Sequence, residues 1–205
     1  VARQLAAVLE KALLHERVRQ ESIRDSLTGL YNHGYLVSQL SYEVERSRRS
    51  SVPVSFLMVE IDSFKQVNDR FGHQTGDVVA KTVARLISEH VRKVDLVGRY
   101  GGDEFGVILP NTDVAGALSV AERLRQLIEE YSFADAEGKR TVRVTVTIGV
   151  ACFPTSASDH TTLIARADAA LYRGKISGKN QVRAAPELAL SSTTSSAEVE
   201  QPNAQ

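Results

Sequence analysis

Two adjacent carboxylates, Asp103 and Glu104, follow a pair of glycines and are the side chains of this sequence best suited to chemistry. Two glycines permit a tight turn at which the backbone can approach a ligand closely, and acidic residues at a hairpin tip suit a divalent metal ion. The flanking segments 96–97 and 107–109 are short and apolar, which predicts two half-buried strands joined by the turn. Taken alone, the pattern also fits an ordinary Gly-Gly hairpin with two solvated acids.

Six segments that follow one another along the chain resemble the motifs of the GGDEF family, the diguanylate cyclases. They cover roughly residues 25 to 183, which is most of the chain. The segments are 25–32 (Asp-Ser-Leu-Thr-Gly-Leu-Tyr-Asn), 64–69, 71–77, 99–106 (Arg-Tyr-Gly-Gly-Asp-Glu-Phe-Gly), 147–150 and 167–175. The resemblance is therefore carried by the whole domain and not by the glycine turn alone.

The resemblance implies an α+β fold with a central mixed, largely antiparallel sheet flanked by helices, similar to the nucleotidyl cyclases and the polymerase palm. It also implies a homodimeric diguanylate cyclase that condenses two GTP molecules into cyclic di-GMP and two pyrophosphates. Periodicity and capping residues predict helices and strands in a compatible order. The expected helices are 32–49, 64–69, 77–91, 113–131 and 161–173, and the expected strands are 54–61, the pair around 101–102, and 142–152.

The resemblance further implies a site for two Mg²⁺ or Mn²⁺ ions in each half-site. Its ligands would be Asp103, Glu104, Glu60 and the backbone carbonyl of Ile61, with Asp103 also helping to deprotonate the attacking hydroxyl. The family usually has Asp-x-Asp where this chain has Glu60-Ile61-Asp62, so the first ligand carries an extra methylene. Mg²⁺ demands near-ideal geometry, whereas Mn²⁺ accepts the same oxygens. Glu60 leaves open an alternative, a catalytically silent module that binds GTP or cyclic di-GMP and regulates a partner.

Guanine recognition falls by resemblance on Asn68 and Asp77, because an amide and a carboxylate can read the edge of guanine that adenine lacks. Asp77 could equally act as an acid near a helix N-terminus. The triphosphate would bind backbone N–H groups of a turn and nearby lysines. These substrate-binding residues are Ser63, Phe64, Lys65, Lys175 and Lys179.

Arg92 and Asp95 form an Arg-x-x-Asp motif shortly before the glycine turn, which resembles the family's inhibitory product site. An arginine can donate to O6 and N7 of guanine while an aspartate accepts from its N1 and N2 hydrogens. Arg123 matches the arginine that completes this site. Away from this register, an Arg-x-x-Asp motif is usually a surface ion pair.

The composition is that of a globular protein without a charged field. Its 205 residues include 25 basic and 25 acidic ones, so no net charge recruits nucleic acid or an anionic membrane. Cys152 is the only cysteine, which excludes an internal disulfide and favours a core position over a redox role. Because no apolar run is long enough to span a bilayer, we expect a cytoplasmic domain without direct membrane contact.

Three regions are expected along the chain. Residues 1–24 predict a signalling helix that either folds back on the domain or, as we favour, forms a coiled coil with a second copy and links it to an upstream GAF-type sensor. Residues 25–183 are expected to form the catalytic domain. Residues 184–205 have too little apolar surface to fold and predict a disordered tail. Because the chain begins with Val1, we expect a fragment whose sensor is missing and whose full-length form could be membrane-attached.

Overall fold

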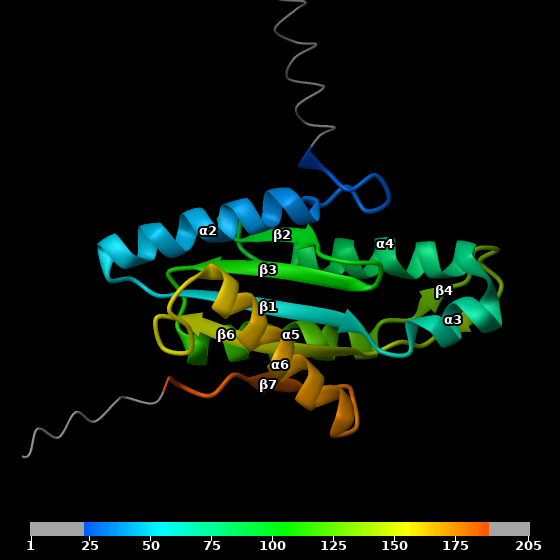
Figure 1. Ribbon diagram of the computed structural model, residues 1–205. Coiled ribbons are helices and arrows are strands. Elements are labelled where there is room, and N and C mark those ends of the chain that lie inside the picture. The colour runs from blue at the N-terminus through cyan, green and yellow to red at the C-terminus, as the bar shows by residue number, and fades with distance from the viewer. Residues whose placement is uncertain (1–22, 189–205) are drawn as a thin grey trace, which may run out of the picture.

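The computed structural model describes residues 23–188, in which a sheet carries helices on both faces (Figure 1). The strands are β1 (Val54–Ile61), β2 (Leu96–Arg99), β3 (Glu104–Pro110), β4 (Phe133–Ala134), β5 (Thr141–Val142), β6 (Val146–Phe153) and β7 (Val182–Ala184). The helices are α2 (His33–Ser50), α3 (Phe64–Phe71), α4 (His73–Glu89), α5 (Val114–Glu130) and α6 (His160–Ile176).

The main sheet has five strands in the order β2-β3-β1-β6-β7, and β4 and β5 form a separate two-stranded ribbon. Neighbouring strands of the main sheet are antiparallel except β6 and β7, which are parallel. This arrangement confirms the predicted mixed, largely antiparallel sheet with flanking helices. The central strand β1 pairs along its whole length with β6 on one side, and all of its residues except Ile61 pair with β3 on the other side.

Strand β1 is buried on both faces because its side chains alternate between two apolar layers. Phe56 and Met58 join the layer formed with α2 and α6, whereas Leu57 and Val59 join the layer formed with α4 and α5. Figure 1 shows α6 crossing one face of the sheet and α5 lying behind it. The sheet is therefore held between two helical layers, which fixes the ends of its strands.

Helix α6 packs unusually close to β6 at a glycine. A Cβ atom on Gly149 would lie 2.0 Å from the carbonyl oxygen of Ala167, so any larger residue would push the helix away. A second close approach occurs at Gly174, where a Cβ would lie 2.6 Å from Cγ2 of Thr147. These contacts set the position of the C-terminal half of α6, which carries Lys175.

The two largest differences from the expected element bounds concern α4 and the strand 142–152. Helix α4 begins at His73 rather than at Asp77, so Asp77 lies in its second turn and is not an acid of the first turn. The expected strand 142–152 is divided, because β5 ends at Val142 and β6 begins at Val146.

The expected domain boundary after residue 183 falls within β7. Ala185 is buried beyond it and donates its N–H to the carbonyl of Val150 at 2.7 Å. Almost all of the predicted signalling helix, and residues 189–205 of the predicted tail, lie outside the described residues. Within residues 23–188, no helix is both long and apolar enough to span a bilayer.

Candidate active site

The register of the sheet places two predicted metal ligands directly opposite each other. Glu60 of β1 pairs with Glu104, the first residue of β3. Asp103 comes immediately before Glu104, and its carbonyl oxygen accepts the N–H of Ile61 at 3.1 Å. Like charges opposite each other on adjacent strands repel. The fold thus gathers the four predicted metal-site residues at one end of the sheet, where a cation would be stabilising.

A lysine from α6 faces the same carboxylates. The Lys175 ammonium lies 2.5 Å from both carboxylate oxygens of Glu60, whose side chain is 13% exposed. Burial, followed by the charges of Glu60, Asp103 and Asp168, raises the pKa of Glu104, and Lys175 opposes this rise. Asp168 is one of the charges that raise the pKa of Glu104, and the sequence analysis assigned no role to it. The acidic cluster is therefore only partly neutralised by the chain itself.

The donor set at this end of the sheet suits a hard divalent cation. Carboxylate and carbonyl oxygens are the ligands that Mg²⁺ and Mn²⁺ prefer. Within the described residues 23–188, no three His, Cys, Asp or Glu side chains are arranged to hold a metal ion by themselves. A cation at this end of the sheet would therefore need oxygen ligands besides these carboxylates, and the backbone carbonyl of Ile61 is the one that the sequence predicted.

Arg99, the last residue of β2, holds the glycine turn through hydrogen bonds. Arg99 donates to the carbonyl of Gly101 at 3.1 Å and to that of Gly102 at 2.7 Å. Its Nη1 also contacts both carboxylate oxygens of Asp25 at 3.2 and 3.3 Å. A Cβ on Gly101 would lie 2.5 Å from Oε2 of Glu104, so this glycine makes room for the carboxylate. Segment 25–32 thus supports the turn through Asp25 and Arg99. The sequence analysis did not predict this role.

The predicted phosphate-binding residues are only partly brought together. The Lys179 ammonium donates to Oγ of Ser63 at 2.8 Å, and Ser63 precedes α3 with a left-handed φ of 56°. Phe64 packs against the core, and Lys65 is exposed in the first turn of α3. Lys175 instead contacts Glu60, as described above. One lysine therefore faces the turn before α3 and another faces the carboxylates.

The two predicted guanine readers lie at the junction of α3 and α4. A Cβ on Gly76 would lie 1.9 Å from Oδ1 of Asn68, so the amide of Asn68 lies against this glycine. Asp77 follows Gly76 and is exposed. Gly76 is thus a residue that the site requires and that spacing alone did not identify.

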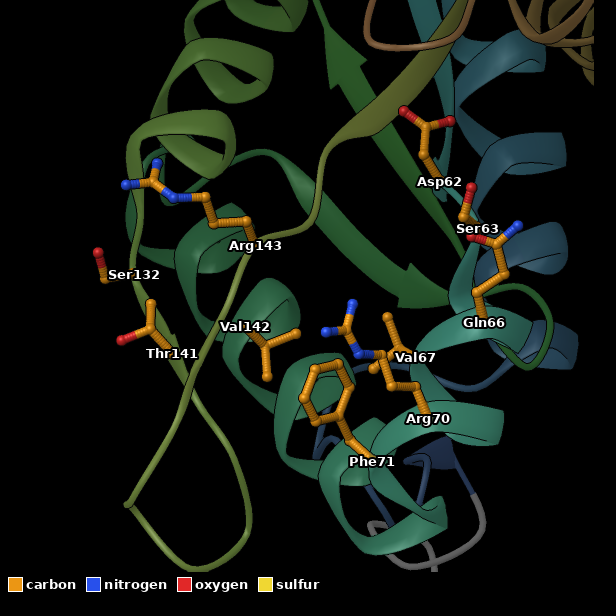
Figure 2. Close-up of a pocket in the computed structure, with 10 residues that line it drawn as sticks. All are labelled: Asp62, Ser63, Gln66, Val67, Arg70, Phe71, Ser132, Thr141, Val142 and Arg143. Atoms are coloured by element: carbon orange, nitrogen blue, oxygen red, sulfur yellow. The ribbon is translucent and has the colours of Figure 1, made fainter.

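A cavity of about 630 Å³ lies between α3 and the β4-β5 ribbon (Figure 2). Figure 2 shows the Arg70 guanidinium over the ring of Phe71, at 5.1 Å from the ring centroid, while Arg143 extends away from it. The lining includes Ser63 but neither Asn68 nor any of the opposed carboxylates. This cavity is therefore separate from the guanine readers and the acidic cluster.

The predicted inhibitory residues surround another cavity, of about 480 Å³. Arg92, Asp95 and Arg123 all line it. Oδ2 of Asp95 accepts the backbone N–H of Arg92 at 2.7 Å, whereas Oδ1 is buried and has no hydrogen-bond partner among residues 23–188. Burial also raises the pKa of Asp95 against the opposing effect of both arginines. The Arg-x-x-Asp motif thus holds a buried acceptor oxygen close to the charges of two arginines.

Comparisons with known proteins identify the family of this chain. Residues 22–181 match the family model described as "Diguanylate cyclase, GGDEF domain". The response regulator PleD of Caulobacter vibrioides is 42% identical over 161 residues, which is 78% of this chain and 36% of that protein. Diguanylate cyclase A of Treponema denticola is 35% identical over 181 residues, which is 87% of this chain and 48% of that protein. The chain thus spans between about a third and a half of these relatives.

Solved structures show the same fold. The coiled coil and GGDEF domain of DgcB from Caulobacter crescentus, in complex with c-di-GMP, has a TM-score of 0.85 at 29% identity and covers 90% of this chain and 96% of that one. The GGDEF domain of PA1120 from Pseudomonas aeruginosa has a TM-score of 0.76 at 34% identity and covers 79% of this chain and 94% of that one. With its opposed carboxylates behind a Gly-Gly turn, this chain belongs to the GGDEF domain family of diguanylate cyclases.

Proposed function

We propose that this domain is an active diguanylate cyclase that converts two GTP molecules into cyclic di-GMP and two pyrophosphates. The observation that carries the proposal is the pairing of Glu60 with Glu104, directly beside Asp103. In each condensation a ribose 3′-oxygen bonds to the α-phosphorus of the other GTP. The bond from that phosphorus to the β-phosphate breaks, and pyrophosphate leaves.

The residues of the acidic cluster divide into binding and proton-transfer roles. Glu60, Glu104, Asp103 and the carbonyl of Ile61 would hold Mg²⁺ or Mn²⁺, for which we propose two ions in each half-site. The chemistry that these ions supply when bound is neutralisation of phosphate charge and a lowered pKa of the attacking hydroxyl. Asp103, at the exit of the turn, would accept the proton of that hydroxyl.

The substrate would extend from the carboxylates to the α3–α4 junction. Lys179, Ser63 and the N–H groups of the following turn would bind the β- and γ-phosphates, because the start of a helix presents unpaired N–H groups to anions. Asn68 and Asp77 would read guanine. Each chain offers one such half-site and the product is symmetric, so the active form would be a homodimer. A cytoplasmic location and control by an upstream sensor complete the proposal.

Product inhibition would act through the separate cavity lined by Arg92, Asp95 and Arg123. The side chain of Asp95 would turn its buried Oδ1 toward the cavity and accept a hydrogen from guanine N1 or N2, and Arg92 would donate to O6 and N7. We propose that cyclic di-GMP binds there. None of the carboxylates of the acidic cluster lines this cavity. A ligand in the cavity would therefore not block the binding of GTP sterically.

The test is turnover of GTP with each metal, followed by chromatography of the product. Glu60→Gln should abolish cyclic di-GMP formation, because the carboxamide is nearly isosteric but lacks the negative charge. Glu60→Asp, the matched variant with the family's usual residue, should equal or exceed native activity with Mg²⁺. Product formation by Glu60→Gln at the native rate would show that Glu60 is not a ligand.

A second candidate function is a silent module that binds GTP or cyclic di-GMP and regulates a partner. Two observations favour it, namely the glutamate at position 60 and its contact with Lys175. Such a module would bind GTP without turnover. If neither the native protein nor Glu60→Asp makes product as a confirmed dimer, this function replaces the cyclase.

A further inference from the structure

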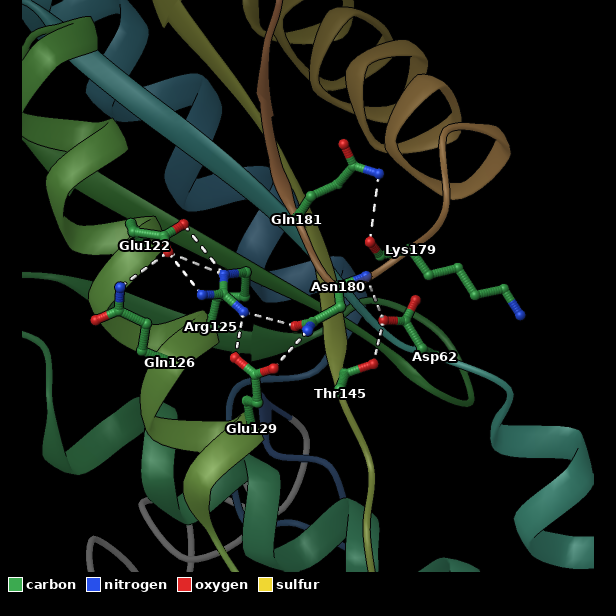
Figure 3. Close-up of polar contacts among 9 residues, drawn as sticks. All are labelled: Asp62, Glu122, Arg125, Gln126, Glu129, Thr145, Lys179, Asn180 and Gln181. Atoms are coloured by element: carbon green, nitrogen blue, oxygen red, sulfur yellow. Dashed lines mark hydrogen bonds and ion pairs between the residues drawn. The ribbon is translucent and has the colours of Figure 1, made fainter.

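A chain of hydrogen bonds joins α5 to the loop that carries Lys179 (Figure 3). Arg125 of α5 donates to Oδ1 of Asn180 at 2.7 Å, and Nδ2 of Asn180 donates to Glu129 at 2.8 Å. Arg125 is itself held by Glu122 and Glu129, and its side chain is only 13% exposed. The amide of Asn180 is therefore fixed at both ends.

The backbone of Asn180 is fixed by a second, buried group. Its N–H donates to Oδ2 of Asp62 at 2.9 Å. Asp62 is 6% exposed, and its carboxylate also accepts the hydroxyls of Thr145 and Thr147 at 2.6 Å each. Through these three hydrogen bonds Asp62 ties the backbone of Asn180 to Thr145 and Thr147, whereas Glu60 is the carboxylate that lies opposite Glu104.

The loop that these hydrogen bonds hold has a backbone conformation that residues other than glycine normally avoid. The φ angles are 120° at Gly178, 63° at Lys179 and 46° at Asn180. The left-handed backbone conformation is unfavourable for L-amino acids and persists where the surrounding structure imposes it. Asn adopts this conformation more readily than most residues. In this conformation the Lys179 ammonium reaches Oγ of Ser63 at 2.8 Å.

We propose that Arg125 and Asn180 are positioning residues for the triphosphate of GTP. Neither needs to touch the nucleotide. They hold Lys179 in the left-handed conformation from which its ammonium faces Ser63 and the first turn of α3. The inference deepens the proposed function and rests on it, since it takes the triphosphate to be the ligand of Lys179.

The test combines binding and turnover. The affinity for GTP is measured by calorimetry with Ca²⁺, and KM and kcat are measured with Mg²⁺ and Mn²⁺. Asn180→Ala and Arg125→Met should each raise Kd and KM about tenfold with kcat changed less than about twofold, because a binding contact common to substrate and transition state is weakened. Asn180→Gly, which accommodates the left-handed backbone, should recover part of this affinity. Gln126→Ala is the matched control on α5, because Gln126 contacts Glu122 and not Asn180.

A double-variant cycle separates positioning from general stability. If Asn180 acts through Lys179, the variant Asn180→Ala with Lys179→Ala should bind GTP no more weakly than Lys179→Ala alone. Additive losses, or native affinity in a folded Asn180→Ala, would overturn the proposal. Should Arg125→Met fail to fold, the two Asn180 variants decide.

The result also separates this inference from the proposed function. A native protein that binds GTP without making product would refute the cyclase alone, and the Kd comparison would still decide the positioning role. A native protein that binds no GTP would refute both.

Discussion

Breaking the contact between Arg99 and Asp25 should destabilise the fold far more than the loss of a surface ion pair. The two side chains are 18% and 21% exposed, and Arg99 also donates to two carbonyls of the glycine turn. Hydrogen bonds to charged groups are worth roughly 1.5–3 kcal/mol, whereas exposed ion pairs contribute about 0–1 kcal/mol. Because partial exposure discounts these values, Arg99→Met should lower the free energy of unfolding by about 2–4 kcal/mol.

The measurement is urea unfolding followed by circular dichroism. Native protein, Arg99→Met, Asp25→Asn and the double variant form a cycle whose coupling energy should be about 1–2 kcal/mol. Arg85→Met is the control. The side chains of Arg85 and Glu89 form an ion pair and are 48% and 51% exposed, so this pair should contribute less than about 1 kcal/mol. Additive effects of the two variants, or an Arg99→Met loss no larger than that of the control, would refute the reasoning.

The same contact has a pH dependence of known sign. Burial raises the pKa of Asp25, but hydrogen bonds from Thr28 and the charge of Arg99 outweigh it, so the pKa is lowered overall. A carboxyl with a lowered folded pKa stabilises the fold above its unfolded pKa and loses this contribution as pH falls through the folded value. The stability difference between native protein and Asp25→Asn should therefore be full at neutral pH and shrink below about pH 4. A difference that stays constant down to pH 3 would contradict this.

Three further variants test separate parts of the site. Gly76→Ala should raise KM for GTP, because its Cβ would lie 1.9 Å from Oδ1 of Asn68; steady-state kinetics with a native KM would show that Asn68 is not a guanine reader. Arg92→Ala should weaken cyclic di-GMP binding in calorimetry by about tenfold or more, through loss of a charged hydrogen bond beside Asp95, and native affinity would assign the product elsewhere. Asp62→Asn should cost about 2–4 kcal/mol of unfolding free energy, because the amide cannot accept all three hydrogen bonds; a loss under about 1 kcal/mol would show that this buried carboxylate is dispensable.

Local signals in the sequence were sufficient for several elements. Strand β1 has the predicted bounds 54–61, because a mainly apolar run that only Ser55 and Glu60 interrupt begins after Pro53 and ends before Asp62. Helix α2 follows Asn32, whose side chain accepts the N–H of Tyr35 as an N-cap does. The start of α4 could not be read, because Gly72 is at once the C-cap of α3 and the N-cap of α4. A break of one residue leaves no loop for the pattern to show.

The assembly of the site depended on contacts that spacing does not encode. The opposed pair of Glu60 and Glu104 follows from strand register, and the sequence placed these residues together only through family resemblance. The contact between Asn180 and Asp62 joins residues 118 positions apart, and that between Arg99 and Asp25 joins residues 74 apart. Such long-range bonds have no periodicity, so the sequence did not indicate the supporting residues, whereas the family resemblance named the carboxylates that the register brings together.

Strand β7 protects an edge of the sheet. The family match ends at residue 181, but β7 lies beyond it and covers β6 along residues 148–150. A chain cut at the end of the family match would expose the backbone of a fully buried strand, and such unpaired apolar edges are templates for association between chains. Three residues with the exposed, charged Arg183 at their centre end the sheet in a form that resists pairing. We therefore expect the resistance of this domain to association through its sheet edge to depend on β7, a segment to which no site residue was assigned.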